Sequence, residues 1–496
     1  MNTETGAWRP APLRVRRRRW KLKPDPTQVI CRLHIPGGQP ARIRALIERV
    51  LALSDAEATE VLAHVLIKFA DRHRHFKRIL EDHFAQVAHL VPPEAAANET
   101  RRLLIGAYFT MEYAVASAAL FNPSMVLHPD QSGLEPGALR FVMSLRAVGE
   151  GHISSLVFRS GVITAGGHVL FDPVSDYVET PKRRLDPEYD KALFARKLAE
   201  MGAANDITEH LLGPLPPRFP YSALAARIEA LFRQPLFDAA RQAEAVRAVN
   251  WLAHSNYEVD FNPLFPISER VIFPVSEAER GGIEDARFVQ FYDDDGQSIY
   301  YATYTAYDGA RILPQLLETR DFVHFKVSTL NGRAAQNKGM ALFPRRIGGR
   351  YAMLSRLDGE NNYVMYSDNL HFWDYACLIQ TPREPWELVQ LGNCGSPLET
   401  HAGWLVITHG VGPMREYAIG AVLLDLDDPS RMIARLRRPL LVADEAEREG
   451  YVPNVVYSCG GLLHNGDLYL PYAMSDISSG LVSVPVDELL AAMEPV

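Results

Sequence analysis

The residues best placed to do chemistry are Glu284, Asp285 and Arg287, two carboxylates and a guanidinium that follow a pair of glycines. After them, alternating apolar and aromatic residues flank the turn at residues 293–296. Such runs on both sides of an Asp-Gly turn predict a β-hairpin. A rigid strand would therefore hold Asp285 and point it at a ligand, which makes Asp285 the predicted chemical centre. The alternative is a structural ion pair between Asp285 and Arg287.

The composition is that of an ordinary globular protein. The chain has 496 residues, of which 47% are hydrophobic and 23% charged, and its length allows about three domains. The net charge of −8 gives no reason to expect nucleic acid or an acidic membrane as a partner. We find no signal peptide and no apolar run long enough to span a bilayer, and the four cysteines lack CxxC spacing. We therefore expect a cytoplasmic protein with reduced thiols and no zinc site.

A basic N-terminal arm, residues 1–40, differs from this acidic balance. Eight Arg and Lys residues lie between Arg9 and Lys23. We expect a solvated arm, or basic side chains laid on an acidic face of the same protein or of a partner subunit. A nucleic-acid-binding arm is the less favoured alternative, because the rest of the chain is acidic and shows no binding motif.

Residues 41–120 have helical spacing of apolar side chains. Ser54 and Glu57 resemble a capping box at the start of one helix. A second helix is predicted from about Glu99 to Leu120, with apolar residues along one side. These patterns predict an all-α N-terminal region.

From residue 121 onward the sequence pattern changes to strand-like runs separated by Gly and Asp turns, and similar hairpins recur. The polar residues that close the later hairpins, Thr305, Arg356, His409 and Asp476, recur at intervals of roughly fifty to seventy residues. That spacing suits one propeller blade of about four strands per hairpin. The hairpins comprise residues 124–146, 285–305, 340–356, 396–409 and 459–476.

The longest interval, between the first two hairpins, contains a helix-like insertion at residues 188–254. Its expected helices cover residues 189–201, 221–233 and 237–252. The prediction is a mainly β chain: a five-bladed β-propeller at residues 121–496 that carries this helical insertion and follows an α-helical N-terminal extension. Polar residues at equivalent positions of several blades would meet near the propeller axis.

From Phe121 to about Met493 the chain resembles glycoside hydrolase family 130, the inverting β-mannoside phosphorylases and β-mannosidases. Members of that family are five-bladed propellers, in agreement with the repeats. The chain departs from the family pattern at Ala286, where a proline is usual, and in the N-terminal residues and the insertion, which compact members lack. The matching stretches are residues 121–123, 282–287, 301–306, 342–344, 349–351, 403–405, 409–411, 423–426, 428–429 and 452–456.

The resemblance implies roles for individual residues. Asp285 matches the family's proton donor, acting through a sugar hydroxyl as relay, and Glu284 would bind a sugar hydroxyl or pair with Arg287. Each residue also has an ordinary structural alternative, such as an exposed turn residue or core packing. The implied phosphate-binding residues are Arg311, Lys338, His409 and Tyr417, of which the first three are expected cations. The implied substrate-binding residues are Asn122, Arg146, Glu284, Arg287, Tyr304, Arg356 and Asp476.

The expected reaction is inverting phosphorolysis of β-mannosides, or its reverse, with phosphate as nucleophile and α-mannose 1-phosphate as product. A hydrolase would need a second carboxylate to activate water, whereas a phosphorylase needs cations to hold phosphate. One alternative is therefore an inverting β-mannosidase of the same fold, and another is a non-catalytic sugar-binding propeller.

The expected partners are a β-linked manno-oligosaccharide or mannoside and inorganic phosphate as co-substrate. No metal or organic cofactor is expected, because the sequence has no GxGxxG, no P-loop and no His/Cys ligand cluster. The helical regions are candidates for walling the acceptor side or for building a homo-oligomer.

Overall fold

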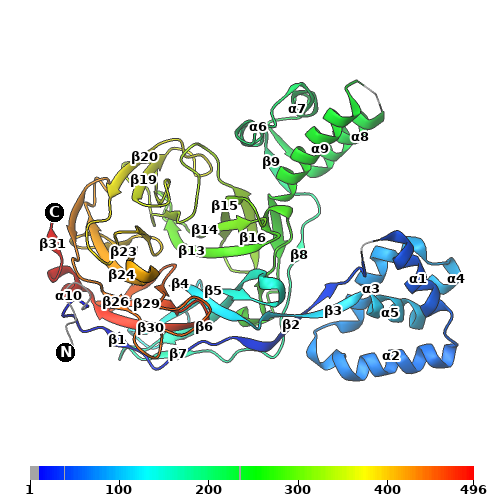
Figure 1. The fold of residues 1–496 in the computed structure, drawn as a ribbon, viewed down its shortest axis with the longest axis horizontal. Coiled ribbons are helices and arrows are strands. Elements are labelled where there is room, and N and C mark those ends of the chain that lie inside the picture. The colour runs from blue at the N-terminus through cyan, green and yellow to red at the C-terminus, as the bar shows by residue number, and fades with distance from the viewer. Residues whose placement is uncertain (1–9, 38, 234–235) are drawn as a thin grey trace.

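The computed structural model describes residues 10–37, 39–233 and 236–496. Antiparallel sheets dominate and surround a common centre (Figure 1). All the predicted hairpins form, with the expected antiparallel pairing. The pairs are β4 (Ala119–Leu127) with β5 (Leu139–Val148), β13 (Gly282–Tyr292) with β14 (Ser298–Tyr307), β17 (Ala341–Leu342) with β18 (Tyr351–Ser355), β22 (Leu398–Thr400) with β23 (Gly403–Val411), and β28 (Leu462–His464) with β29 (Asp467–Met474).

Further strands extend each hairpin outward. A parallel bridge between Gly282 and Ser154 links the first group to the second, so these two groups form one larger sheet. The described strands thus form several sheets and no single closed sheet. The added strands are β6 (Ser154–Ile163) on β5, β15 (Ile312–Thr319) and β16 (His324–Thr329) after β14, β19 (Asn362–Ser367) and β20 (Ala376–Gln380) after β18, β24 (Tyr417–Leu424) and β25 (Met432–Arg435) after β23, and β30 (Ser478–Pro485) on β29.

The core lies between neighbouring sheets. Every residue of β23 is buried, because other parts of the protein cover both faces of this strand, so its sequence lacks a polar face. Phe288 packs against Phe322 at a centroid distance of 5.6 Å, and Phe343 packs edge-on against Trp404 at 5.2 Å. The first contact consolidates the largest sheet, and the second holds two neighbouring sheets together, so both stiffen the centre of the protein.

The N-terminal helices form a lobe on a two-stranded stem (Figure 1). The predicted capping box is confirmed, because Ser54 and Glu57 exchange hydrogen bonds at the start of α2. The prediction of one helix from Glu99 to Leu120 is wrong, since the helix ends at Tyr108 and β3 follows and pairs with β2. The partner strand lies far away in sequence, so helical spacing alone could not reveal it. The elements are β2 (Asp25–Leu33), α1 (Pro40–Leu51), α2 (Asp55–Phe69), α3 (Phe76–Val87), α4 (Pro93–Ala97), α5 (Glu99–Tyr108) and β3 (Thr110–Ala116).

The described part of the basic arm lies on the last sheet. β1 (Arg16–Arg17) pairs with β30, and the guanidinium of Arg17 donates to Glu447 at 3.1 Å. Arg14 forms an ion pair with Glu488. These contacts match the interpretation of basic side chains laid on an acidic face of the same protein. Arg9 lies outside the described residues.

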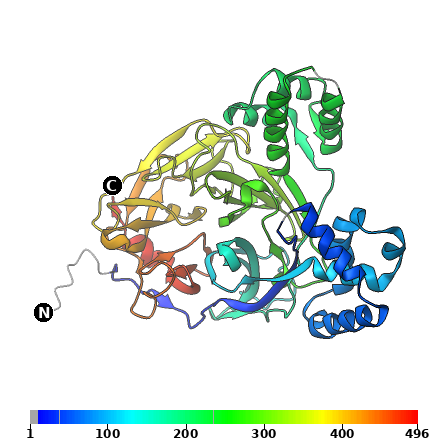
Figure 2. The same cartoon turned by 45° about the vertical axis from the view of Figure 1, so that its right-hand side comes forward.

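The insertion forms a second helical lobe beside the sheets (Figure 2). The expected helices are present, and a short helix with an Asn205 cap was not predicted. The ammonium of Lys197 donates to the backbone oxygen of Leu330 at 2.8 Å and so fastens the lobe to the segment before Lys338. No described helix combines the length and the apolar character needed to cross a membrane. The helices are α6 (Lys191–Glu200), α7 (Asp206–Leu212), α8 (Tyr221–Arg233) and α9 (Ala239–His254).

Candidate active site

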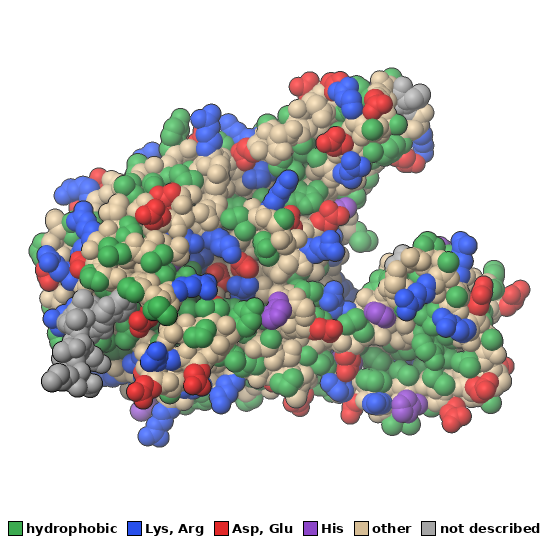
Figure 3. Space-filling view, viewed as in Figure 1, with side chains coloured by type: hydrophobic (Ala, Val, Ile, Leu, Met, Phe, Trp, Pro, Cys, Tyr) green, Lys and Arg blue, Asp and Glu red, His purple; other side chains and the backbone are tan. Residues whose placement is uncertain are grey.

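A cavity of about 280 Å³ opens where the five hairpin groups meet. Figure 3 shows Lys and Arg side chains gathered around a hollow in this part of the surface. Most of the predicted site residues line the cavity, although they come from segments far apart in the sequence. The lining residues are Asn122, Arg146, Glu284, Asp285, Lys338, Arg356, His409, Arg415, Tyr417, Val452, Val455, Tyr457 and Asp476.

Two β-bulges direct Asp285 and Asn122 into this cavity. The β13–β14 register shifts between Glu284 and Arg287, and Asp285 has a φ of +56°. The β4–β5 register shifts in the same way around Asn122, whose φ is +48°. Bulges re-aim side chains, and left-handed backbone is unfavourable for residues other than glycine, so both features are typical of functional positions. The Asn122 amide nitrogen donates to Asp285 Oδ1 at 2.6 Å.

The charges around Asp285 favour its carboxylate form. Burial by itself raises the pKa of this group. The positive charges of Arg146 and Arg287 and the hydrogen bond from Asn122 outweigh burial, so the pKa lies below its usual value. Arg146 Nη1 lies 3.4 Å from Asp285 Oδ1. A proton donor at this position therefore requires bound ligands to change the electrostatic balance.

Asp476 is a second carboxyl group in the same cavity, at the turn between β29 and β30 with a φ of +53°. Burial raises the pKa of Asp476 to about 6, and the negative charge of Asp285 adds to this rise. Arg146 and Arg415 offset it only in part. The cavity therefore places two carboxyl groups side by side with opposite pKa shifts, an arrangement typical of acid–base sites.

Glu284 connects the two sides of the cavity. Its carboxylate accepts a hydrogen bond from Arg146 Nη2 at 2.9 Å and another from Lys338 Nζ at 2.5 Å. The predicted pairing of Glu284 with Arg287 is therefore wrong. Glu284 instead holds two cations of the cavity lining, Arg146 beside Asp285 and Lys338.

Arg287 is not among the residues that line the cavity, so the structure does not place it with the other predicted substrate-binding residues. The side chain is buried, with Nη2 donating to the Tyr457 hydroxyl at 2.5 Å and Nη1 to the Asp285 backbone oxygen at 3.3 Å. The alternative of a direct ion pair with the Asp285 carboxylate is also not observed. Arg287 thus stabilises the bulge in β13 from the side away from the cavity.

A further set of lining residues, called here the cationic wall, consists of Lys338, Arg356, His409 and Tyr417. Arg356 Nη1 donates to His409 Nε2 at 3.4 Å, and the rings of His409 and Tyr417 stack at 5.8 Å. Burial, together with the positive charges of Arg356 and Arg287, lowers the pKa of His409 well below its usual value. The expectation of a cationic His409 is therefore wrong, because the buried ring is neutral at neutral pH. The positive charge on this wall comes from Lys338 and Arg356.

Two predicted residues lie away from the cavity. Arg311 is exposed on the turn between β14 and β15, where its backbone N–H donates to Asp308 Oδ1 at 2.6 Å. It lines a separate cavity beside the insertion helices, so the structure does not place it with the other phosphate-binding candidates. Tyr304 is buried, and its hydroxyl donates to Glu279 at 2.6 Å. It is a core residue because it shares one face of β14 with Tyr300 and Ala302, which pack in the same hydrophobic cluster.

Arg415 and Tyr457 line the cavity but were not predicted as site residues. Arg415 follows Met414 in a loop where both residues have positive φ values. No sequence pattern used above marks such a loop. Tyr457 follows a matched family stretch directly, which was the available signal.

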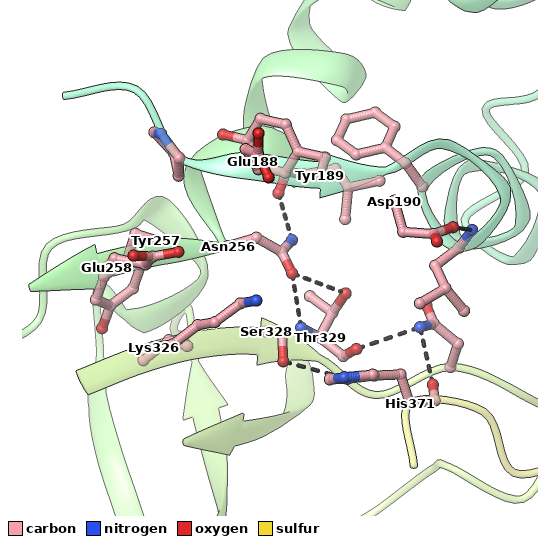
Figure 4. A pocket seen from close by; sticks show the side chains of 16 residues that line it. Glu188, Tyr189, Asp190, Asn256, Tyr257, Glu258, Lys326, Ser328, Thr329 and His371 are labelled. Atoms are coloured by element: carbon pink, nitrogen blue, oxygen red, sulfur yellow. Dashed lines mark hydrogen bonds between the residues drawn. The ribbon is translucent and has the colours of Figure 1, made fainter. Parts of the chain in front are cut away.

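A smaller cavity of about 100 Å³ lies between the insertion and β16 (Figure 4). His371 faces it and contacts the Ser328 hydroxyl at 3.3 Å. Burial and the positive charge of Lys326 lower the pKa of His371 to about 4. None of the predicted site residues lines this cavity.

Comparison with known proteins identifies the family of this chain. A family model described as β-1,4-mannooligosaccharide phosphorylase, glycoside hydrolase family 130, matches residues 259–495. A 1,2-β-oligomannan phosphorylase from Thermoanaerobacter is 34% identical over 223 residues, which are 43% of this chain and 72% of that protein. A β-1,2-mannobiose phosphorylase from Listeria innocua is 29% identical over 239 residues, which are 46% of this chain and 65% of that protein. The solved β-1,2-mannobiose complex of the Listeria innocua phosphorylase aligns with a TM-score of 0.44 and 19% identity, covering 76% of this chain and 92% of that one.

The family match and the relatives indicate an enzyme that breaks or forms glycosidic bonds. The chain belongs to glycoside hydrolase family 130, as its motifs indicated.

Proposed function

We propose that this protein is an inverting β-mannoside phosphorylase. Phosphate would attack the anomeric carbon of the terminal mannose while Asp285 supplies a proton to the departing oxygen, directly or through a sugar hydroxyl. The products would be α-mannose 1-phosphate and the shortened mannoside. The observation that carries this proposal is the shared cavity, which Asp285, Lys338 and Arg356 all line. The names of the relatives support the same reaction.

In this proposal Lys338 and Arg356 hold phosphate, and Asp285 carries the proton. Lys338 supplies a point charge and Arg356 a planar guanidinium, both suited to phosphate. A bound phosphate anion would also add negative charge near Asp285 and offset Lys338, one of the cations that lower the pKa of this carboxyl group. Phosphate and sugar binding would therefore raise the pKa of Asp285 and allow it to carry the proton. The reaction uses inorganic phosphate as co-substrate and requires no organic cofactor.

We infer that the hairpin groups are five propeller blades and that residues 121–496, with the insertion, form the catalytic domain. In support, Arg146, Arg356, His409 and Asp476 close equivalent strands of different groups and reach the same cavity. Thr305, the remaining equivalent, is buried and pairs with Glu284 in the sheet. A cytoplasmic location and a homo-oligomer formed through the helical lobes stay predictions.

The experiment incubates the protein with β-mannobiose and longer β-mannosides, with and without phosphate. We expect α-mannose 1-phosphate, identified by ³¹P NMR, to form only with phosphate and only when Asp285 is intact. Mannose released at equal rates in both conditions would instead show a hydrolase. That alternative is favoured by Asp476, a second carboxyl group that could activate water once ionised. If the wild-type protein binds the sugar but converts it neither with nor without phosphate, it is a non-catalytic propeller.

A further inference from the structure

Two loops pack together beside the central cavity. The segment Gly149–Ile153 follows β5, the strand that carries Arg146, and the other loop precedes β27 (Val456–Tyr457). The rings of His152 and Tyr451 meet across these loops at a centroid distance of 5.4 Å and an angle of 31°. Tyr451 nevertheless remains 69% exposed. The pair therefore presents an open aromatic surface to solvent.

This aromatic pair lies beside the cavity, close to Asp476. Val452, the neighbour of Tyr451, lines the cavity, and its N–H donates to the Ser475 backbone oxygen at 3.1 Å, next to Asp476. On the other loop, the Glu150 backbone oxygen accepts a hydrogen bond from Tyr113 at 2.9 Å, which fastens that loop to the stem of the helical lobe. Both loops are thus tied to fixed parts of the structure.

A third loop completes this side of the cavity mouth. It carries Arg415, which lines the cavity, and Met414, which is 93% exposed. His152, Met414 and Arg415 all have φ between +56° and +59°. Left-handed backbone at residues other than glycine is unfavourable and is found mostly at functional sites. Here this backbone conformation occurs in two loops that border the same cavity.

We propose that Tyr451, backed by His152, is a stacking platform for the leaving sugar, with Arg415 as its polar partner. The inference rests on the proposed phosphorolysis. The leaving sugar must lie on the side of Asp285, because that group protonates the glycosidic oxygen, whereas phosphate approaches from the opposite face. A pyranose ring has an apolar C–H face that an aromatic ring can cover and hydroxyl groups that a guanidinium can bind. Tyr451 would therefore determine affinity for the acceptor and not for phosphate or mannose 1-phosphate.

The test runs the reaction in the synthetic direction, with α-mannose 1-phosphate as donor and mannose or β-mannobiose as acceptor. We expect Tyr451→Ala to raise the acceptor KM about five- to tenfold. The donor KM should stay within about twofold, and Tyr451→Phe should behave like the wild type because stacking needs the ring alone. Tyr375→Ala is the matched control, since Tyr375 is 79% exposed before β20 and does not line the central cavity.

An unchanged acceptor KM in Tyr451→Ala would overturn the platform, and so would an equal change in the donor KM or in Tyr375→Ala. A wild type that cannot use α-mannose 1-phosphate would contradict the proposed function instead. Titration of β-mannobiose followed by NMR would then still test the platform, because Tyr451→Ala should weaken that binding by a similar factor.

Discussion

Replacing Arg356 by Ala tests which guanidinium holds phosphate. Arg356 lines the central cavity and donates to His409, whereas Arg311, which the family resemblance indicated, is exposed on a turn outside it. A hydrogen bond to a charged group contributes about 1.5–3 kcal/mol, and about 1.4 kcal/mol corresponds to a tenfold change in affinity. Arg356→Ala should therefore raise the phosphate KM roughly ten- to a hundredfold.

Two further variants sharpen this measurement. Arg356→Lys keeps the charge but loses the planar fork, so its phosphate KM should fall between those of the wild type and Arg356→Ala. Arg311→Ala should leave the phosphate KM unchanged within about twofold, as expected for an exposed surface residue. The assay varies phosphate at saturating β-mannobiose and measures α-mannose 1-phosphate. A large effect of Arg311→Ala together with a small effect of Arg356→Ala would refute the assignment of phosphate binding to the cationic wall.

Asp285→Asn should lower kcat by about a hundred- to ten-thousandfold, the usual contribution of acid–base catalysis, while sugar binding measured by calorimetry persists; loss of binding with the activity would argue against a catalytic role. Asp476→Asn should stabilise the protein by about 1–3 kcal/mol at pH 7.5 and by much less at pH 4, because a carboxyl group whose pKa is raised to about 6 destabilises the fold as pH rises from the unfolded value through 6. Urea unfolding at both pH values measures this difference, and equal effects at the two pH values would contradict it. Ser54→Ala should destabilise the N-terminal helical lobe by about 1 kcal/mol through loss of the capping box, and hydrogen exchange in α2 that matches the wild type would count against this.

The sequence was sufficient to predict local pairing. Alternating residues around Gly and Asp turns identify the hairpins, and equivalence between repeats identifies Arg146, Arg356 and Asp476 as residues that meet. Helical spacing failed at β3, because that strand depends on pairing with β2 some eighty residues earlier in the chain, a separation that local periodicity cannot register.

Several site features depend on contacts that sequence patterns do not contain. The bulges at Asn122 and Asp285 shift the strand register by one residue, and Arg287, which follows the second bulge, lies behind the cavity. Similarly, His409 is neutral because it is buried beside two arginines that come from other strands. Arg311 lies close in sequence to the matched stretch 301–306, but this closeness does not reveal that its turn lies outside the cavity.

The most direct test of the central claim is a crystal structure of the protein with phosphate and mannose bound. The phosphorylase assignment predicts an anion in contact with Lys338 and Arg356, and a mannose ring between that anion and Asp285. An anion bound elsewhere would contradict the phosphate-binding role of Lys338 and Arg356. A sugar that leaves Asp285 without contact would contradict its role as proton donor.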